Sequence, residues 1–280
     1  MAYQEKIFVS PLCREHEISF AGNYGAKGEK RAEKRQATPE QIEKQNQRNR
    51  ENRIRRLIQL NFTSGDYWIT LKYPKGVRKK LEEVLKDFKK FRDNLRRRYK
   101  KADVVMKYIY RVEIGKQGGI HFHILLPRIP DGDMIISECW TKARGTNRIE
   151  EQIEDGYEAM DGLTDFTHIH PAGYYADLAE YITKDLPDER RKDLSKEEQK
   201  KLLSYGCSRN LVRPVPEVKK YSHWTVRRLI DLGVGGLNTT PNRFRTEGFI
   251  IDGSTWVQGI NPVTGMSYVR YTEIPIRRRT

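Results

Sequence analysis

Hydrophobic and polar residues alternate most clearly between Val104 and Ile114. The apolar members of this run share one side of an extended chain: Met106, Tyr108, Tyr110, Val112 and Ile114. Its polar members share the other side: Lys107, Arg111 and Glu113. A period of two predicts a strand with one buried face. A second apolar run, Ile120–Leu126, follows the glycine-rich segment 115–119, which predicts a hairpin loop because glycine tolerates positive φ.

The predicted hairpin has a chemical consequence that depends on its register. A five-residue loop pairs Ile114 with Ile120 and Glu113 with His121, and His123 then joins the same face two residues later. Two imidazoles and one carboxylate form a facial set of three ligands for a divalent metal, with positions left for substrate or water. A slip of one residue would turn Glu113 to the other face. The alternative interpretation is a histidine pair that lines an ordinary amphipathic strand.

Apolar residues that recur every three or four positions predict helices elsewhere in the chain. Val77–Lys101 carries an apolar stripe at helical spacing: Val77, Leu81, Val84, Leu85, Phe88, Phe91, Leu95 and Tyr99. Thr38 and Pro39 are typical of a helix start, and that helix is predicted to reach about Leu60. Further predicted helices are Met134–Lys142, a segment after a capping box at Ser195, and Trp224–Asp231. Predicted strands are Asp66–Tyr73, Arg148–Ile153 and short ones within Gly248–Ile276; Lys6–Cys13 is a short strand or an extended arm.

A helix is also predicted to open at Pro171, and it carries Tyr181 and Lys184 three residues apart. Tyrosines at helical spacing usually pack in a core. A lysine ammonium one turn away can instead favour the phenolate, so that the phenol oxygen acts as a nucleophile. The preceding pair His168 and His170 has no acid in an evident pairing position, and we interpret it as a loop or strand end.

The net charge of the chain indicates what kind of molecule it binds. The 280 residues include 53 Lys or Arg against 38 Asp or Glu, a formal net charge of +15. Nearly all of this excess lies in residues 25–56 and Val77–Lys101. Such a balance favours nucleic acid as a partner, although either basic helix face is also compatible with simple solvation. No apolar stretch approaches a membrane span, the three cysteines have no metal or redox spacing, and no phosphate-binding GxxxxGK[ST] loop occurs. We therefore expect a protein of a reducing cytoplasm without its own helicase motor.

Three segments in this order resemble motifs of the HUH endonuclease superfamily, and within it the rolling-circle replication initiators (Rep) of phages and small plasmids. Phe62–Pro74 resembles the first, strand-borne motif. The segment that carries Glu113, His121 and His123 resembles the second, and Tyr181–Lys184 resembles the third, Tyr-x-x-Lys. The sequence CSRNLVRP, residues 207–214, is similar to a segment of the filamentous-phage gene II-like branch. The resemblance covers residues 61–214.

The resemblance implies a role for each matching residue. Glu113, His121 and His123 would bind Mg or Mn, Tyr181 would be the nucleophile, and Lys184 would assist it. Tyr174 is the second choice of nucleophile, and Tyr175 is its neighbour. The implied fold is α+β, with a central antiparallel sheet of about five strands and helices packed on one side. The metal hairpin would form central strands of that sheet.

The implied reaction is nicking and rejoining of single-stranded origin DNA. A 5′-phosphotyrosine would form, and the free 3′-OH would prime a host polymerase working with a host helicase in the cytoplasm of a bacterial cell. The basic surface would contact the DNA backbone through five cations: Arg78, Lys86, Lys89, Arg96 and Arg97. Residues 1–60 would be a basic arm and helix, residues 61–214 the nuclease domain, and residues 215–280 a basic helix with short strands that is a candidate accessory DNA-binding part.

Three other functions remain open at this level. A transposase or relaxase of the same superfamily would share the chemistry, although the late position of Tyr181 argues against a relaxase. A non-enzymatic DNA-binding protein would keep the basic faces but would not need Glu113 opposite His121. Two histidines and one carboxylate also suit non-haem iron, which leaves the charge unexplained.

Overall fold

The computed structural model describes residues 3–22, 36–74, 76–115, 118–145, 164–184, 195–203, 205–221 and 245–276. The chain divides into two compact units. Unit 1 comprises Met1–Leu60 together with Arg213–Thr280, and unit 2 comprises Asn61–Val212. The predicted α+β class is confirmed, but the described residues form two five-stranded antiparallel sheets where the sequence predicted a single one.

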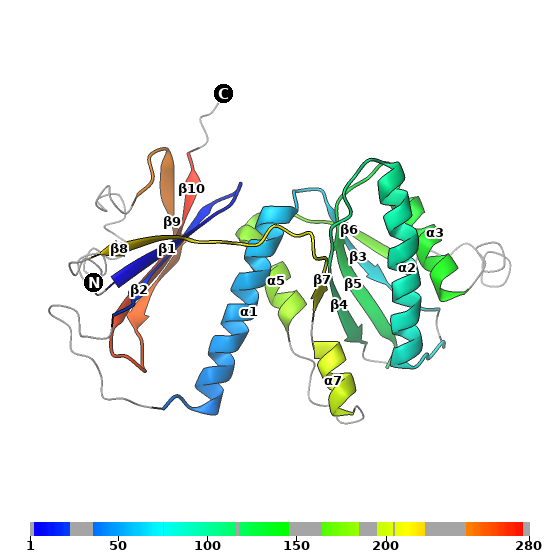
Figure 1. Ribbon diagram of the computed structural model, residues 1–280, viewed down its shortest axis with the longest axis horizontal. Coiled ribbons are helices and arrows are strands. Elements are labelled where there is room, and N and C mark those ends of the chain that lie inside the picture. Colours follow the sequence, from blue (N-terminus) through cyan, green and yellow to red (C-terminus); the bar gives the residue numbers. More distant parts are fainter. Residues whose placement is uncertain are drawn as a thin grey trace. The chain divides into compact units, whose positions relative to one another are not determined.

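The sheet of unit 2 carries the predicted hairpin at its centre (Figure 1). Its strands, in spatial order, are β6 (Thr164–His168), β3 (Tyr67–Leu71), β5 (Ile120–Leu126), β4 (Ile109–Ile114) and β7 (Gly206–Cys207). The predicted register is confirmed, because Ile114 pairs with Ile120 and Glu113 pairs with His121. The loop closes through the Gly115 N–H, which donates to the Gly119 carbonyl at 2.8 Å, and Gly118 turns the chain with a φ of +78°.

Two helices cover one face of this sheet, α2 (Leu81–Lys101) and α3 (Gly132–Arg144) (Figure 1). Phe88 of α2 stacks on Phe122 of β5 with ring centroids 4.0 Å apart, and Trp140 of α3 packs into the same core. α2 begins four residues later than predicted, since the Lys80 N–H is capped by the Glu83 side chain at 3.0 Å. The apolar side chains of α2, β3, β4 and β5 thus pack together in one core.

The opposite face of the sheet receives α5 (Ala176–Thr183). The helix predicted from Pro171 is therefore shorter than expected. Residues Ala172–Tyr175 form a 3-10 turn, in which Gly173, Tyr174 and Tyr175 all have positive φ. Left-handed residues cannot continue a right-handed helix, so α5 starts only at Ala176. α7 (Lys196–Leu203) follows the predicted capping box at Ser195, whose hydroxyl accepts from the Glu198 N–H at 3.2 Å.

Unit 1 joins the two ends of the sequence in one sheet. Its strands, in spatial order, are β8 (Glu217–Tyr221), β1 (Tyr3–Val9), β2 (Arg14–Phe20), β10 (Ser267–Pro275) and β9 (Phe249–Ile260). The predicted N-terminal strand or arm is thus a seven-residue strand paired on both sides. The C-terminal strands are longer than predicted, with 12 residues in β9 and 9 in β10.

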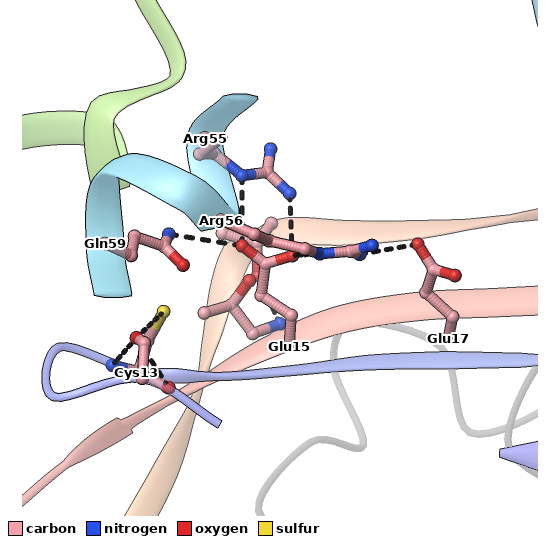
Figure 2. A network of polar contacts seen from close by, with 9 residues as sticks. Cys13, Glu15, Glu17, Arg55, Arg56 and Gln59 are labelled. Atoms are coloured by element: carbon pink, nitrogen blue, oxygen red, sulfur yellow. Dashed lines mark hydrogen bonds and ion pairs between the residues drawn. The ribbon is translucent and has the colours of Figure 1, made fainter. Parts of the chain in front are cut away.

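Helix α1 (Pro39–Asn61) spans the range predicted for it and is fixed to this sheet by buried ion pairs (Figure 2). Glu15 accepts from the guanidinium groups of Arg55 and Arg56 and from the Gln59 amide. Arg56 also donates to Glu17 at 2.7 Å. Burial raises the pKa of the Glu15 carboxyl, but the two guanidinium groups outweigh it and hold that pKa below its ordinary value. Two of the basic residues of α1 are therefore structural.

Two predicted elements, the strand Arg148–Ile153 and the helix Trp224–Asp231, lie outside the described residues. Among the described helices, none combines the length and the apolar character that crossing a membrane would require.

Candidate metal centre and tyrosine site

The three predicted ligands lie together on the open face of the hairpin. Each of Glu113, His121 and His123 offers one ligand atom, and these atoms are within 4.8 Å of one another. Glu113 Oε2 lies 3.1 Å from His123 Nε2 and 3.8 Å from His121 Nε2. The three side chains come from paired positions of β4 and β5 and are 8% to 21% exposed, so the group is held rigidly but can be reached from solvent.

The electrostatics of the group prepare it for a cation. The hydrogen bond from His123 outweighs burial and lowers the pKa of the Glu113 carboxyl to about 2, so Glu113 is ionised at neutral pH. Burial, followed by the nearby His123 ring, lowers the pKa of His121 below its ordinary value, which favours the neutral imidazole. An ionised carboxylate and a neutral imidazole are the forms that bind metal. The residues present therefore fit a divalent cation.

Strand β3 supports His123 from the other side. Thr70 lies opposite His123 in the β3–β5 ladder, and its Oγ1 is 3.1 Å from Nδ1. A contact at Nδ1 fixes the ring and leaves Nε2 facing Glu113. The indole of Trp68, two residues earlier, stacks on the same ring with centroids 5.6 Å apart and planes inclined by 14°. These two positions alternate with the core residues of β3, as the period of two requires.

Tyr181 approaches the same group from helix α5. Its Oη donates to Glu113 Oε2 at 2.8 Å and lies 2.9 Å from His123 Nε2. The Tyr181 side chain is 38% exposed, while Ala179 and Ile182 anchor the helix with 1% exposure each. Burial, and then the hydrogen bond to Glu113, raise the pKa of the Tyr181 phenol above its ordinary value. Positive charge is therefore needed at this site to favour the phenolate.

Arg111, a residue without a predicted role, holds the end of this helix. Its Nη1 donates to the carbonyl oxygens of Tyr181 at 2.7 Å and Ile182 at 3.2 Å, and its side chain is 5% exposed. The last carbonyls of a helix lack partners within the helix, so a buried guanidinium both satisfies them and fixes their position. The sequence feature that could have identified Arg111 is its place on the polar face of β4, two residues before Glu113.

The other tyrosines and the predicted lysine are placed differently. Lys184 lies one residue beyond α5 with extended backbone, at φ −58° and ψ 133°, and its side chain is exposed. The predicted role of Lys184 beside Tyr181 therefore stays a prediction. Tyr174 is separated from Tyr181 by the left-handed turn and so does not share a helix face with it. Tyr175 is buried, with 2% exposure.

The second histidine pair belongs to the end of β6, as predicted for a strand end. His168 Nδ1 donates to the Gly65 carbonyl at 2.8 Å, and its ring lies 5.4 Å from that of Tyr67. His170 is exposed in the following segment. Within the described residues, the only group of at least three His, Cys, Asp or Glu suited to a metal is Glu113, His121 and His123.

The five cations predicted to contact DNA lie on or just before α2. All five side chains are exposed: Arg78, Lys86, Lys89, Arg96 and Arg97. Because α2 packs against the face that carries Phe122, whereas His121 and His123 point to the opposite face, the four cations on α2 and the metal-ligand group lie on opposite sides of the sheet. Arg78, which precedes the helix, instead reaches the hairpin loop at Gly119.

Comparison with known proteins agrees with this geometry. A family model for the replication-associated protein ORF2 and the phage gene II protein matches residues 66–209, which include β3, the hairpin and α5. No curated protein and no solved structure matches the chain. The matched region covers more than half of the sequence and contains all the residues that surround Tyr181. The chain belongs to this family of replication-associated proteins, the phage gene II-like Rep proteins.

Proposed function

We propose that the protein nicks and rejoins single-stranded DNA at a replication origin, with Tyr181 as the nucleophile. Glu113, His121 and His123 would hold Mg or Mn in this account. The observation that carries the proposal is the position of the Tyr181 hydroxyl, within 2.9 Å of atoms of both Glu113 and His123. A core tyrosine would be buried, whereas Tyr181 is 38% exposed and its hydroxyl oxygen lies against a candidate metal group.

The residues around Tyr181 have separate roles in the proposed reaction. Glu113, His121 and His123 would hold the divalent cation, which would supply positive charge to polarise the scissile phosphate and to favour the phenolate. Tyr181 Oη loses its proton to solvent and attacks phosphorus, and the P–O3′ bond breaks. The 3′ oxygen takes up a proton from solvent, and the 5′ phosphate stays on the tyrosine. Because the phosphodiester energy is kept in the covalent link, the strand can be rejoined without ATP.

Positive charge at Tyr181 comes from two further side chains in this proposal. Arg111 fixes the helix end that carries the tyrosine, and its Cζ lies 6.0 Å from the phenol ring centroid. Lys184, exposed just beyond α5, assists by adding charge at the rim of the site. Trp68 stands beside Tyr181 with ring centroids 6.0 Å apart, in a position to stack on an unpaired base next to the scissile phosphate.

A nicking assay tests this function. Single-stranded oligonucleotides tiled across the replicon that encodes the protein are incubated with Mn and run on a denaturing gel. The proposal predicts a protein–DNA adduct that disappears with a chelator and in Tyr181→Phe. Tight DNA binding without an adduct on any tile would favour a non-enzymatic DNA-binding protein. A transposase of the same superfamily would give an adduct at the ends of a mobile element instead of at an origin.

A further inference from the structure

A stripe of cations runs along the outer face of helix α2. Six exposed side chains make up this cation stripe: Lys86, Lys89, Lys90, Arg97, Lys100 and Lys101. They form two groups, Lys86, Lys89 and Lys90 and then Arg97, Lys100 and Lys101, which share one face because seven residues make about two helical turns. The core residues Phe88, Phe91 and Leu95 occupy the other side of the helix. The stripe therefore points away from the sheet over 15 residues, a length of about 22 Å at 1.5 Å per residue.

The acidic residues nearby do not neutralise this stripe. From Lys86 to Lys101 the sequence has nine basic and two acidic residues. Asp87 is 6% exposed and binds Lys79 and the Tyr73 hydroxyl, and Asp93 pairs with Arg96 at 3.1 Å. Asp93 lies on the face of the stripe between Lys90 and Arg97, so the excess charge of the helix is presented to solvent as two groups of cations on one face.

The groove between α2 and α3 widens the same surface. Its volume is about 460 Å³, and four cations line it: Arg97, Arg98, Lys101 and Lys142. Glu138, which also lines the groove, pairs with Arg98 at 3.7 Å and leaves the other three cations in excess. This groove is large enough to take phosphate groups with their bound water.

The outer face of α2 lacks the exposed aromatic rings that favour the binding of single-stranded DNA. Proteins bind single strands by stacking bases on exposed aromatic rings. The aromatic residues of α2 are all in the core, with Phe88 at 1% exposure and Phe91 and Tyr99 at 0%. By contrast, the partly exposed Trp68 lies on the opposite face of the sheet beside Tyr181. The two faces of unit 2 therefore differ in the form of DNA that they suit.

We propose that the cation stripe binds the phosphate backbone of duplex DNA while the opposite face holds the single strand to be nicked. This inference extends the proposed function, because it assigns a second form of DNA to the side of unit 2 away from Tyr181. A stripe of about 22 Å matches about six base pairs at 3.4 Å per step. The DNA that fits this row of cations is the duplex that flanks an opened origin. The sheet between the two faces keeps the duplex and the single strand apart.

Fluorescence anisotropy on the full-length protein tests the inference. The probes are a labelled 20-base-pair duplex and its labelled single strand, each titrated at several salt concentrations. The test variant is Lys89→Gln with Arg97→Gln, and the matched control is Lys196→Gln with Arg209→Gln, which removes two exposed cations of unit 2 off the stripe. Each lost phosphate contact lowers the salt slope by about one, so the stripe variant should lose about two units of slope and about tenfold in duplex affinity.

The outcomes separate the possibilities. A loss of duplex binding in the stripe variant, with a much smaller loss for the single strand and for the control variant, supports the proposal. Equal losses for duplex and single strand, or equal losses in the stripe and control variants, would overturn it in favour of general electrostatics. Adduct formation by the wild type is measured separately. A protein that binds duplex through the stripe but never forms an adduct would refute the proposed function and leave this inference standing.

Discussion

Arg111 of strand β4 and Tyr181 of helix α5 are linked by a hydrogen bond, since a guanidinium nitrogen of Arg111 lies 2.7 Å from the carbonyl oxygen of Tyr181. The arginine belongs to β4, two residues before the candidate ligand Glu113, and the tyrosine belongs to α5. One strand therefore carries both a candidate metal ligand and the group that fixes the position of the proposed nucleophile. Arg111 acts through the position of Tyr181, and so it is a positioning residue.

This link predicts a specific kinetic defect. Replacing Arg111 with Met should lower the rate of adduct formation at saturating DNA by about 10²-fold, because a small displacement of the attacking atom costs this much. The DNA concentration for half-maximal rate should change little. Arg111→Lys keeps one donor and the charge and should recover part of the rate. If instead the rate is unchanged while the thermal midpoint falls, Arg111 has only a structural role.

The candidate metal centre can be tested without catalysis. Mn binding is followed by the loss of the free-ion electron paramagnetic resonance signal, and we expect one ion per chain. Glu113→Gln and His121→Ala should each weaken binding by about 100-fold or more, since even partners outside the ligand set change affinity by up to that factor. Mn should also quench Trp68, which stacks on His123, and Trp68→Phe should remove this quenching. Undiminished Mn binding in both ligand variants would place the ion elsewhere.

Lys184 gives a contrast to Arg111. Its side chain is exposed and lies beyond the end of α5, where charge interactions amount to about 1 kcal/mol or less. We expect Lys184→Met to slow adduct formation by less than about tenfold, measured beside Arg111→Met under the same conditions. A loss larger than that of Arg111→Met would mean that Lys184 contacts the reacting phosphate once DNA is bound.

Unit 1 contains a buried histidine whose protonation should control its stability. His16 Nδ1 lies 2.7 Å from Glu5 and Nε2 lies 3.1 Å from Glu273, while Thr246 N–H and the Tyr221 hydroxyl also donate to these carboxylates. Burial lowers the pKa of His16, but the hydrogen bonds to Glu273 and Glu5 outweigh it and raise that pKa above its ordinary value. Burial raises the pKa of Glu273, and the His16 contact outweighs it and lowers that pKa.

The signs of these shifts define a pH window. A raised histidine pKa gives stability that is complete below about 6.5 and is lost as the pH rises through the folded-state value. A lowered carboxyl pKa gives stability that is present above about 4.3 and is lost as the pH falls. Urea unfolding followed by fluorescence, with Trp256 as reporter through its stacking on Tyr271, should show greatest stability between these values. His16→Gln should flatten the decline on the alkaline side; an unchanged decline would exclude His16 as its cause.

The sequence predicted the centre of unit 2 well, because the interactions there are local. A short glycine loop fixes the hairpin register, and the alternation of Glu113 with Val112 fixes which face is polar. The same alternation marked Arg111, but its partners lie 70 and 71 residues away in α5 and so could not be predicted from the pattern. The start of α5 was misplaced because nothing in the local sequence identifies three consecutive left-handed residues.

The sequence does not predict unit 1 as a unit, because its strand pairings are the most distant ones among the described residues. β2 pairs with β10 through Ile18 and Val269, and β1 pairs with β8 through Tyr3 and Tyr221. Taken alone, each of these strands is a short segment near one end of the sequence. The predicted DNA-binding role of these end segments stays a prediction, although the ion pairs of Arg55 and Arg56 assign part of the basic charge to folding.

The most direct test of the central claim is the chemical identity of the nucleophile. The wild-type protein is reacted with a cleavable single-stranded oligonucleotide and Mn, digested, and the nucleotide-bearing peptide is sequenced by mass spectrometry. We predict that the 5′ phosphate is attached to Tyr181, the tyrosine whose hydroxyl lies 2.8 Å from Glu113. Attachment to Tyr174 or Tyr175, or a cleaved strand without any linked peptide, would contradict the account.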